Sequence, residues 1–330
     1  MKINNRIDFV DNARGIAMLL VILGHCNQTV DCTLNRFILS FHMPLFFFLS
    51  GIFATTTTKG TKNLMGGVKS KAKSILIPQM LLCLIGGIKP IIIAVIQHSS
   101  CDIWSTFGFF RWWFLPTLFI CSVLYMLIGM LVNLENVMNK IIYMIISLIL
   151  IFVSIEFNKY DLHGFFLCLQ IVPVASFFYV FGNIIRPYMA IINNTKTISL
   201  SIAVCIVFCI CFSIANVNTP VMLYKNEYGN LPLFFITSIS GCFLTIYVST
   251  YIKDSILLKY IGRKCVAFYV WQFLVVSLCI SVASRGTKMI SNVENDNIIT
   301  FTAFAMALPI LYIIVKITQK HIPGIYGYKQ

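Results

Sequence analysis

Two histidines near the N-terminus are the residues whose type and position best suit acid–base chemistry. His25 lies at the end of an apolar stretch that begins after Arg14, and His42 lies in the next apolar stretch, just before Pro44. A neutral imidazole accepts a proton near neutral pH, so either ring could act as a general base. A hydrogen bond between packed elements would need the same residue type. Position alone leaves both interpretations open.

A run of cations is the second feature that could support chemistry. The segment from Lys59 to Lys73 contains five lysines and no acidic residue. Fixed cations hold phosphate groups through charge-assisted hydrogen bonds, so the run could form the mouth of a phosphate-binding site. The same charges would also suit a loop that lies against anionic lipid. The charge pattern alone does not distinguish these alternatives.

The composition shows which kind of structure must position these residues. Apolar residues make up 58% of the 330-residue chain and charged residues 11%, and the mean hydropathy is +0.87. Soluble domains carry about 25% charged residues, so a water-soluble fold and a disordered chain are both excluded. We therefore expect an all-α integral membrane protein, with a single transmembrane domain over residues 1–330.

The apolar runs give the expected helices. A helix needs roughly 20 apolar residues to cross about 30 Å of hydrocarbon, and about ten runs approach that length. They are continuous rather than alternating, which excludes the strands of a membrane barrel. The runs lie near residues 13–30, 37–56, 75–97, 112–133, 141–156, 163–184, 198–216, 232–252, 264–283 and 298–317.

The basic residues predict the orientation of these helices. With ten crossings, eighteen Lys and Arg residues fall on the side of the N-terminus and six on the other side, while Lys89 lies inside the third run. Basic residues favour the cytoplasmic side, so both termini are expected to be cytoplasmic. The net charge of +14 therefore reflects topology in a multi-pass inner (cytoplasmic) membrane protein, and nucleic acid is not expected as a partner.

The first run places His25 deep in the membrane. Arg14 and His25 are eleven residues apart, which is about 16 Å along a helix at 1.5 Å per residue. We expect the imidazole to face the interior of the bundle, because lipid would leave its nitrogens without partners. The expected cytoplasmic end of this helix is polar and carries Arg6, Asp8, Asp11, Asn12 and Arg14.

The cysteines indicate neither a disulfide framework nor a metal site. Eight of the twelve lie inside apolar runs, where cysteine packs as a small hydrophobic residue. No pair has the C-x-x-C spacing of a metal ligand set, so no metal is expected.

Four segments resemble a known family. RIDFVDNARGIA at 6–17, followed by LGH at 23–25, resembles the opening signature of the membrane acyltransferase family 3, and is most similar to its branch of fucose O-acetylase-like sugar acetyltransferases. The second-helix and fourth-helix blocks of that family resemble FHMPLFFFLSG at 41–51 and WFLPTLF at 113–119. IGRKCVAFY at 261–269 resembles its ninth-helix block, with Cys265 where serine is usual; Gln272 follows where histidine is common.

The resemblance implies a reaction. It implies transfer of an acyl group, most simply acetyl from acetyl-CoA, to a hydroxyl of a cell-envelope polysaccharide or lipid-linked sugar. The expected partners are thus acyl-CoA, a glycan acceptor and membrane lipid.

The resemblance also implies roles for particular residues. His25 would be the general base, and His42 would orient the acceptor or relay the proton. Asp11 lies three residues before Arg14 and so shares its helix face, and a pair between them would hold the guanidinium toward the cofactor. The expected cofactor-binding residues are Arg6, Asp11, Arg14, Lys71 and Lys73, and the expected acceptor-binding residues are Phe41 and Trp113.

Two other classes of function remain open at this point. A transporter or flippase for a glycan or small anion could use His25 as a proton relay. The chain shows no inverted halves and no broken helices in corresponding positions, which disfavours this alternative. A membrane domain of this kind could also bind a ligand without catalysing a reaction.

Overall fold

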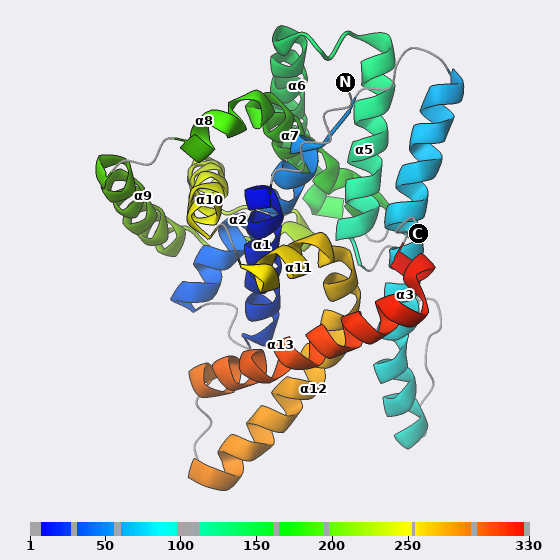
Figure 1. The fold of residues 1–330 in the computed structure, drawn as a ribbon, viewed down its shortest axis with the longest axis vertical. Helices are drawn as coiled ribbons and strands as arrows, with labels where there is room; N and C mark the ends of the chain where they lie inside the picture. Colours follow the sequence, from blue (N-terminus) through cyan, green and yellow to red (C-terminus); the bar gives the residue numbers. More distant parts are fainter. Residues whose placement is uncertain are drawn as a thin grey trace.

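The computed structural model describes residues 8–27, 32–55, 61–97, 108, 112–160, 165–194, 198–252, 255–291 and 296–326. Within these ranges the chain is helical, and the β-interaction seen is an isolated bridge between Met222 and Glu227. The α-helices (Figure 1) are α1 (Asp8–Cys26), α2 (Thr33–Ile52), α3 (Thr61–Ile96), α5 (Phe114–Leu131), α6 (Val137–Glu156), α7 (Phe165–Ile185), α8 (Met189–Asn194), α9 (Ile198–Val217), α10 (Leu231–Tyr251), α11 (Ile256–Arg263), α12 (Cys265–Ser291) and α13 (Asp296–His321). The 3-10 turns are η1 (Phe157–Tyr160), η2 (Arg186–Tyr188), η3 (Leu223–Lys225) and η4 (Pro323–Tyr326).

The long helices confirm the all-α membrane fold. Among the described residues, nine helices are long and apolar enough to cross a membrane, namely α1, α3, α5, α6, α7, α9, α10, α12 and α13. Each of the ten predicted runs overlaps one long helix, and the run at 37–56 corresponds to α2. This helix has 20 residues but contains Asn35, Arg36 and His42, which lower its apolar character. The number of crossings and the cytoplasmic location of the termini stay predictions.

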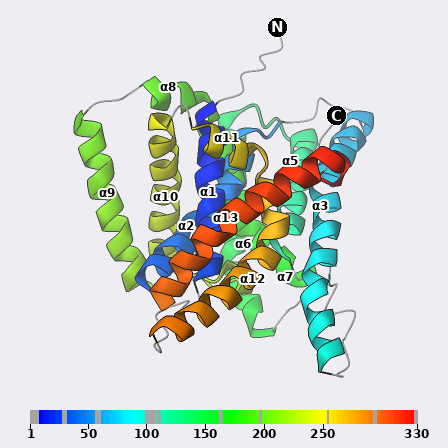
Figure 2. The same ribbon diagram turned by 60° about the horizontal axis from the view of Figure 1, so that its bottom comes forward.

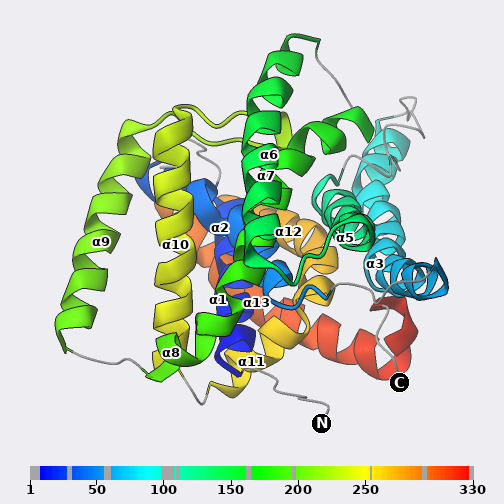
Figure 3. The same cartoon turned by 90° about the horizontal axis from the view of Figure 1, so that it is seen from above.

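The helix α1 lies at the centre of the bundle (Figure 3) and packs against α2, α10, α11, α12 and α13. Of the residues in the apolar segment of α1, 61% are buried, and in α7 the share is 67%. In α6 and α9 only 17% and 11% of these residues are buried. Apolar side chains exposed on α6 and α9 suit contact with lipid. The interior of the bundle is therefore built around α1 and α7, and α1 begins at the same end of the bundle as α13 ends (Figure 2).

Aromatic residues of α2 form much of this interior. Phe46, Phe47 and Phe48 are buried, and α2 packs between α7 and α10. The Phe46 and Phe47 rings lie 5.6 Å and 5.4 Å from the ring of Phe114, measured between centroids. Such ring pairs add to the burial of apolar surface, and here they join α2 to the start of α5.

Two glycines allow α1 and α11 to approach closely. A Cβ atom on Gly262 would overlap the carbonyl group of Asp11, and one on Gly15 would overlap that of Leu258. Small residues at helix contacts let the backbones come together in this way. The contact brings Arg263, at the end of α11, beside Asp11. The Nε of Arg263 donates a hydrogen bond to the Asp11 carboxylate at 2.9 Å.

Candidate active site

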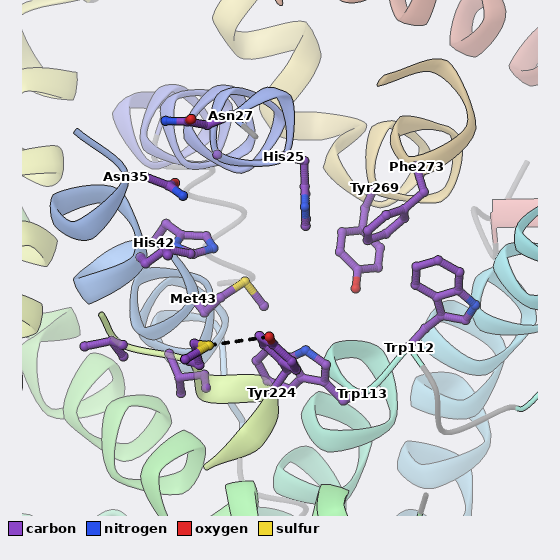
Figure 4. Close-up of a pocket in the computed structure, with 15 residues that line it drawn as sticks. His25, Asn27, Asn35, His42, Met43, Trp112, Trp113, Tyr224, Tyr269 and Phe273 are labelled. Carbon is purple, nitrogen blue, oxygen red and sulfur yellow. Dashed lines mark hydrogen bonds between the residues drawn. The ribbon is translucent and has the colours of Figure 1, made fainter. Parts of the chain in front are cut away.

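A cavity of about 390 Å³ contains both histidines, and we call it the histidine cavity. Residues of α1, α2, α12, the start of α5 and the segment around η3 surround it (Figure 4). The lining consists of Gly24, His25, Asn27, Asn35, Leu39, His42, Met43, Trp112, Trp113, Val221, Met222, Leu223, Tyr224, Tyr269 and Phe273. Most of these side chains are apolar or aromatic, and a few polar groups converge among them, as in many ligand sites.

His42 has a fixed orientation and tautomer in this cavity. Its Nδ1 lies 2.8 Å from the carbonyl oxygen of Ile38, one turn earlier on α2. A carbonyl accepts hydrogen bonds, so Nδ1 carries the proton and donates, and Nε2 keeps its lone pair. The side chain is 7% exposed and lines the cavity. His42 can therefore accept a hydrogen bond or a proton from a bound group without rearranging.

His25 is held by packing rather than by hydrogen bonds. Its ring centroid lies 4.8 Å from that of Phe273, and among the described residues none hydrogen-bonds to its nitrogens. The side chain is exposed, and it also lines a second hollow of about 300 Å³ beside Ser277 and Ser281 of α12. The imidazole thus lies in the last turn of α1 between two hollows, rather than enclosed in the bundle interior as expected, and its nitrogens are accessible to a bound substrate.

The segment 218–230 covers part of the histidine cavity, and we call it the roof. Arg36 donates from Nη1 to the carbonyl oxygens of Asn216 and Asn218, at 2.9 Å and 3.3 Å. The roof places Met222 and Tyr224 in the cavity lining, where the Tyr224 hydroxyl donates to the sulfur of Met222 at 3.5 Å (Figure 4). Long-range contacts to α2 therefore hold the roof in place.

Asn226 anchors the roof at its turn. It has a left-handed backbone (φ 58°), and its side chain donates to the carbonyl oxygen of Ser154 and to the side-chain oxygen of Asn158, each at 3.0 Å. The hydroxyl of Tyr228 donates to Asn226 Oδ1 at 2.5 Å. Burial raises the pKa of Tyr228 above its ordinary value, so the phenol stays protonated and keeps donating. This network ties the roof to the end of α6.

A second cavity, of about 330 Å³, contains three cations, and we call it the basic cavity. Arg14, Lys71 and Arg263 reach it from α1, α3 and α11, and no acidic side chain is among its lining residues in the described part of the chain. The lining consists of Arg14, Met18, Phe46, Ser50, Phe53, Lys71, Ser74, Ile75, Phe114, Leu115, Leu118, Ser122, Gly262, Arg263, Cys265, Val266, Tyr269 and Tyr326. Cations collected in this way favour an anionic ligand.

The predicted pair between Asp11 and Arg14 does not form. Arg14 instead donates to the carbonyl oxygen of Leu49 at 3.5 Å and stacks over the ring of Phe53, 4.7 Å from its centroid. Asp11 is buried and pairs with Arg263, which the sequence analysis did not select. Asp11 therefore positions a cation of the basic cavity, but a different one from the one predicted.

Three other predicted site residues lie away from the cavities or outside the described residues. Lys73 is exposed and does not line the basic cavity, because a residue two positions after Lys71 lies on the other side of the helix. Phe41 is 2% exposed and packs against Gly241 of α10, so it is part of the core rather than of the histidine cavity. Arg6 lies outside the described residues.

The histidine cavity is lined by His25, His42 and Trp113, and the basic cavity by Arg14 and Lys71. The roles of these residues stay predictions. The residues that the sequence analysis missed are Arg263, Tyr269 and the roof. The sequence signal for Arg263 and Tyr269 is the segment at 261–269, which resembles the ninth-helix block of the family and contains both residues. Among the described residues, no group of three His, Cys, Asp or Glu side chains is placed to hold a metal ion.

The arrangement can bind an anionic group at one cavity and accept a proton at the other. The comparison with family models matches the model of an acyltransferase domain, of the acyltransferase 3 family, to residues 7–316. The comparisons with curated proteins and with solved structures gave no significant match.

Proposed function

The chain belongs to the acyltransferase 3 family, and we propose that it is a membrane O-acetyltransferase that moves acetyl from acetyl-CoA to a hydroxyl of a cell-envelope polysaccharide or lipid-linked sugar. The family indicates a membrane acyltransferase. The donor, the acceptor, the histidine base and the fucose O-acetylase-like branch are part of the proposal.

The basic cavity supports the donor side of the proposal. Coenzyme A carries phosphate groups, and Arg14, Lys71 and Arg263 offer cations to such groups from three helices around the cavity. The thioester supplies an activated acyl group when the donor is bound. Phe46 and Phe114 make the inner part of the same cavity apolar, which suits an uncharged arm better than a phosphate.

The histidine cavity supports the acceptor side. In the proposed reaction His25 takes the proton of the acceptor hydroxyl while the hydroxyl oxygen bonds to the acyl carbon and the carbon–sulfur bond breaks. The proton then returns to the departing sulfur, so the histidine ends as it began. His42 holds its Nε2 ready to orient the hydroxyl or to share the proton, and Trp113 and Tyr224 offer apolar faces with polar edges to a sugar.

The observation that carries the proposal is the junction of the two cavities. The two linings share Tyr269, so a donor arm in one cavity and an acceptor hydroxyl in the other approach the same point. A reaction between the two ligands needs this adjacency, because reacting atoms must come within about 3–3.5 Å.

The proposal is tested with purified protein, acetyl-CoA labelled in the acetyl group, and a candidate glycan acceptor. Removing the general base in His25→Ala should lower label transfer about 10²–10⁴-fold, with an unchanged thermal unfolding midpoint. The matched control is His321→Ala, which removes an exposed histidine at the end of α13 and should transfer label normally. Normal transfer by His25→Ala, or movement of a glycan across vesicles without label transfer, would contradict the proposal.

A further inference from the structure

Tyr269 lies where the two cavities meet. Among the described residues it is the one side chain that lines both the histidine cavity and the basic cavity. It is 7% exposed and comes from the first part of α12, with its hydroxyl directed into the histidine cavity (Figure 4).

Neighbouring residues on the surrounding helices show that the cavities lie end to end. On α2, Met43 lines the histidine cavity and Phe46, one turn later, lines the basic cavity. At the start of α5, Trp113 lines the histidine cavity and Phe114 lines the basic cavity. The change from one lining to the other therefore occurs at one level of the bundle, and Tyr269 lies at that level.

Aromatic rings fill this level. The centroid of the Tyr269 ring lies 5.3 Å from that of Phe114, and the Phe114 ring lies 5.6 Å from that of Phe46. On its other side the Tyr269 ring lies 5.7 Å from that of Phe273, which packs against His25. Rings at these separations are in contact, and Tyr269, Phe114 and Phe46 are buried, so packed aromatic side chains lie between the two cavities.

We propose that the Tyr269 side chain is a partition between the donor and acceptor cavities, and that it turns aside when the acyl end of the donor approaches the histidines. This inference rests on the proposed acetyltransferase function. Tyr269 is the ring with space to move, since a cavity lies on each side of it. Gating by a side chain of this kind excludes water from the reactive group until the acceptor is in place.

Cys265 gives a probe that needs no acyl transfer. It lines the basic cavity one turn before Tyr269 on α12. The membrane-impermeant reagent 2-sulfonatoethyl methanethiosulfonate is added to intact cells and, separately, to inverted membrane vesicles, and modification of the Cys265 peptide is measured by mass spectrometry. The wild-type chain should be modified in one of the two preparations, the one that exposes the basic cavity.

Removing the Tyr269 ring should let the reagent reach Cys265 from both sides of the membrane. Tyr269→Ala should be modified at Cys265 in both preparations, and so should Tyr269→Leu, which fills more of the space and guards against loss of folding. Tyr269→Phe keeps the ring, so Cys265 should still be modified in only one of the two preparations. The matched control is Tyr247→Ala, which removes a ring on α10 that lines neither cavity. In this variant too, Cys265 should be modified in only one preparation.

Each other outcome overturns the partition. Modification of the wild-type chain from both sides would show an open path, and modification of neither preparation would show that the basic cavity is closed. One-sided modification of Tyr269→Ala and Tyr269→Leu would show that another element separates the cavities. These results are independent of label transfer by His25→Ala, so failure of the partition and failure of the acetyltransferase proposal are distinguishable.

Discussion

The basic cavity and the histidine cavity have similar volumes, about 330 Å³ and 390 Å³, but different construction. Helices supply the three cations of the basic cavity, and the close contact between α1 and α11 at Gly262 brings one of them, Arg263, into place. The histidine cavity takes its two histidines from α1 and α2, but one of its walls is the roof at 218–230. Arg36 and Asn226 hold this wall through contacts with segments distant in the sequence.

This difference indicates a division of tasks between the cavities. A wall of helices with fixed charges suits a ligand of constant chemistry, such as the phosphates of a nucleotide cofactor. A separate roof can change its side chains without altering the helices, as binding loops on rigid scaffolds do. We therefore expect substitutions in the roof to affect the acceptor, and substitutions in the basic cavity to affect the donor.

The largest expected effect concerns Asn226, at the turn of the roof. Asn226→Ala puts alanine in the left-handed conformation at φ 58°, where its Cβ atom has no polar group to compensate for the strain of about 1–2 kcal/mol. The substitution also removes three side-chain hydrogen bonds, each worth about 1 kcal/mol. Amide hydrogen exchange of residues 218–230 should accelerate strongly. The KM for the acceptor should rise while the KM for acetyl-CoA stays the same.

The control for this change is Asn226→Gly, which tolerates the left-handed backbone and loses only the hydrogen bonds. Its exchange rates should lie between those of the wild type and Asn226→Ala. If both variants weaken the donor rather than the acceptor, the roof does not belong to the acceptor side, and the division between the cavities is wrong.

The next effect concerns proton transfer in the histidine cavity. The amide of His42→Asn can still donate to the carbonyl of Ile38, but it has no group at the position of Nε2. We expect kcat to fall about 10²-fold, the lower end of the range for acid–base catalysis. The unfolding midpoint should stay the same because the hydrogen bond to α2 is retained. A lower midpoint together with normal kcat would mean that His42 has a structural role alone.

Much of this comparison could be predicted from the sequence, because a polar residue in an apolar chain is a strong signal. His25 and Arg14 stand out for that reason, and Lys71 belongs to the run of five lysines from Lys59 to Lys73. The depth of His25 in the membrane stays a prediction, and the structure places this residue in the last turn of α1 with an exposed side chain. The all-α fold follows from the same contrast. The sequence therefore predicts the histidines of one cavity and two of the three cations of the other.

Tertiary contacts account for what the sequence could not predict. Asp11 pairs with Arg263, 252 positions away, rather than with Arg14, three positions away. Phe41 is buried because Gly241 on α10 leaves room for its ring, a relation that no local pattern contains. The roof depends on Arg36 and Asn218, whose separation in the sequence is 182 residues.

A smaller effect tests the donor side of the comparison. Lys71→Gln removes one of the cations of the basic cavity, and loss of one hydrogen bond between charged groups, about 1.5–3 kcal/mol, corresponds to roughly 10-fold or more in binding. The KM for acetyl-CoA should rise accordingly, and that for the acceptor should not. Lys73→Gln is the matched change on the exposed side of α3 and should leave both KM values unchanged. Equal effects of the two substitutions would favour general attraction to charge over a defined site.

The smallest effect concerns the Tyr224 hydroxyl in the roof. The hydroxyl donates to the sulfur of Met222, and a thioether is a weak acceptor. Tyr224→Phe should therefore change the acceptor KM by less than about threefold, below the effect of one ordinary hydrogen bond of about 1 kcal/mol. Tyr224→Ala also removes the ring that lines the cavity and should raise the acceptor KM further. If the loss in Tyr224→Phe equals that in Tyr224→Ala, the hydroxyl binds the acceptor directly, and the polar specificity of the histidine cavity comes from the roof as well as from its histidines.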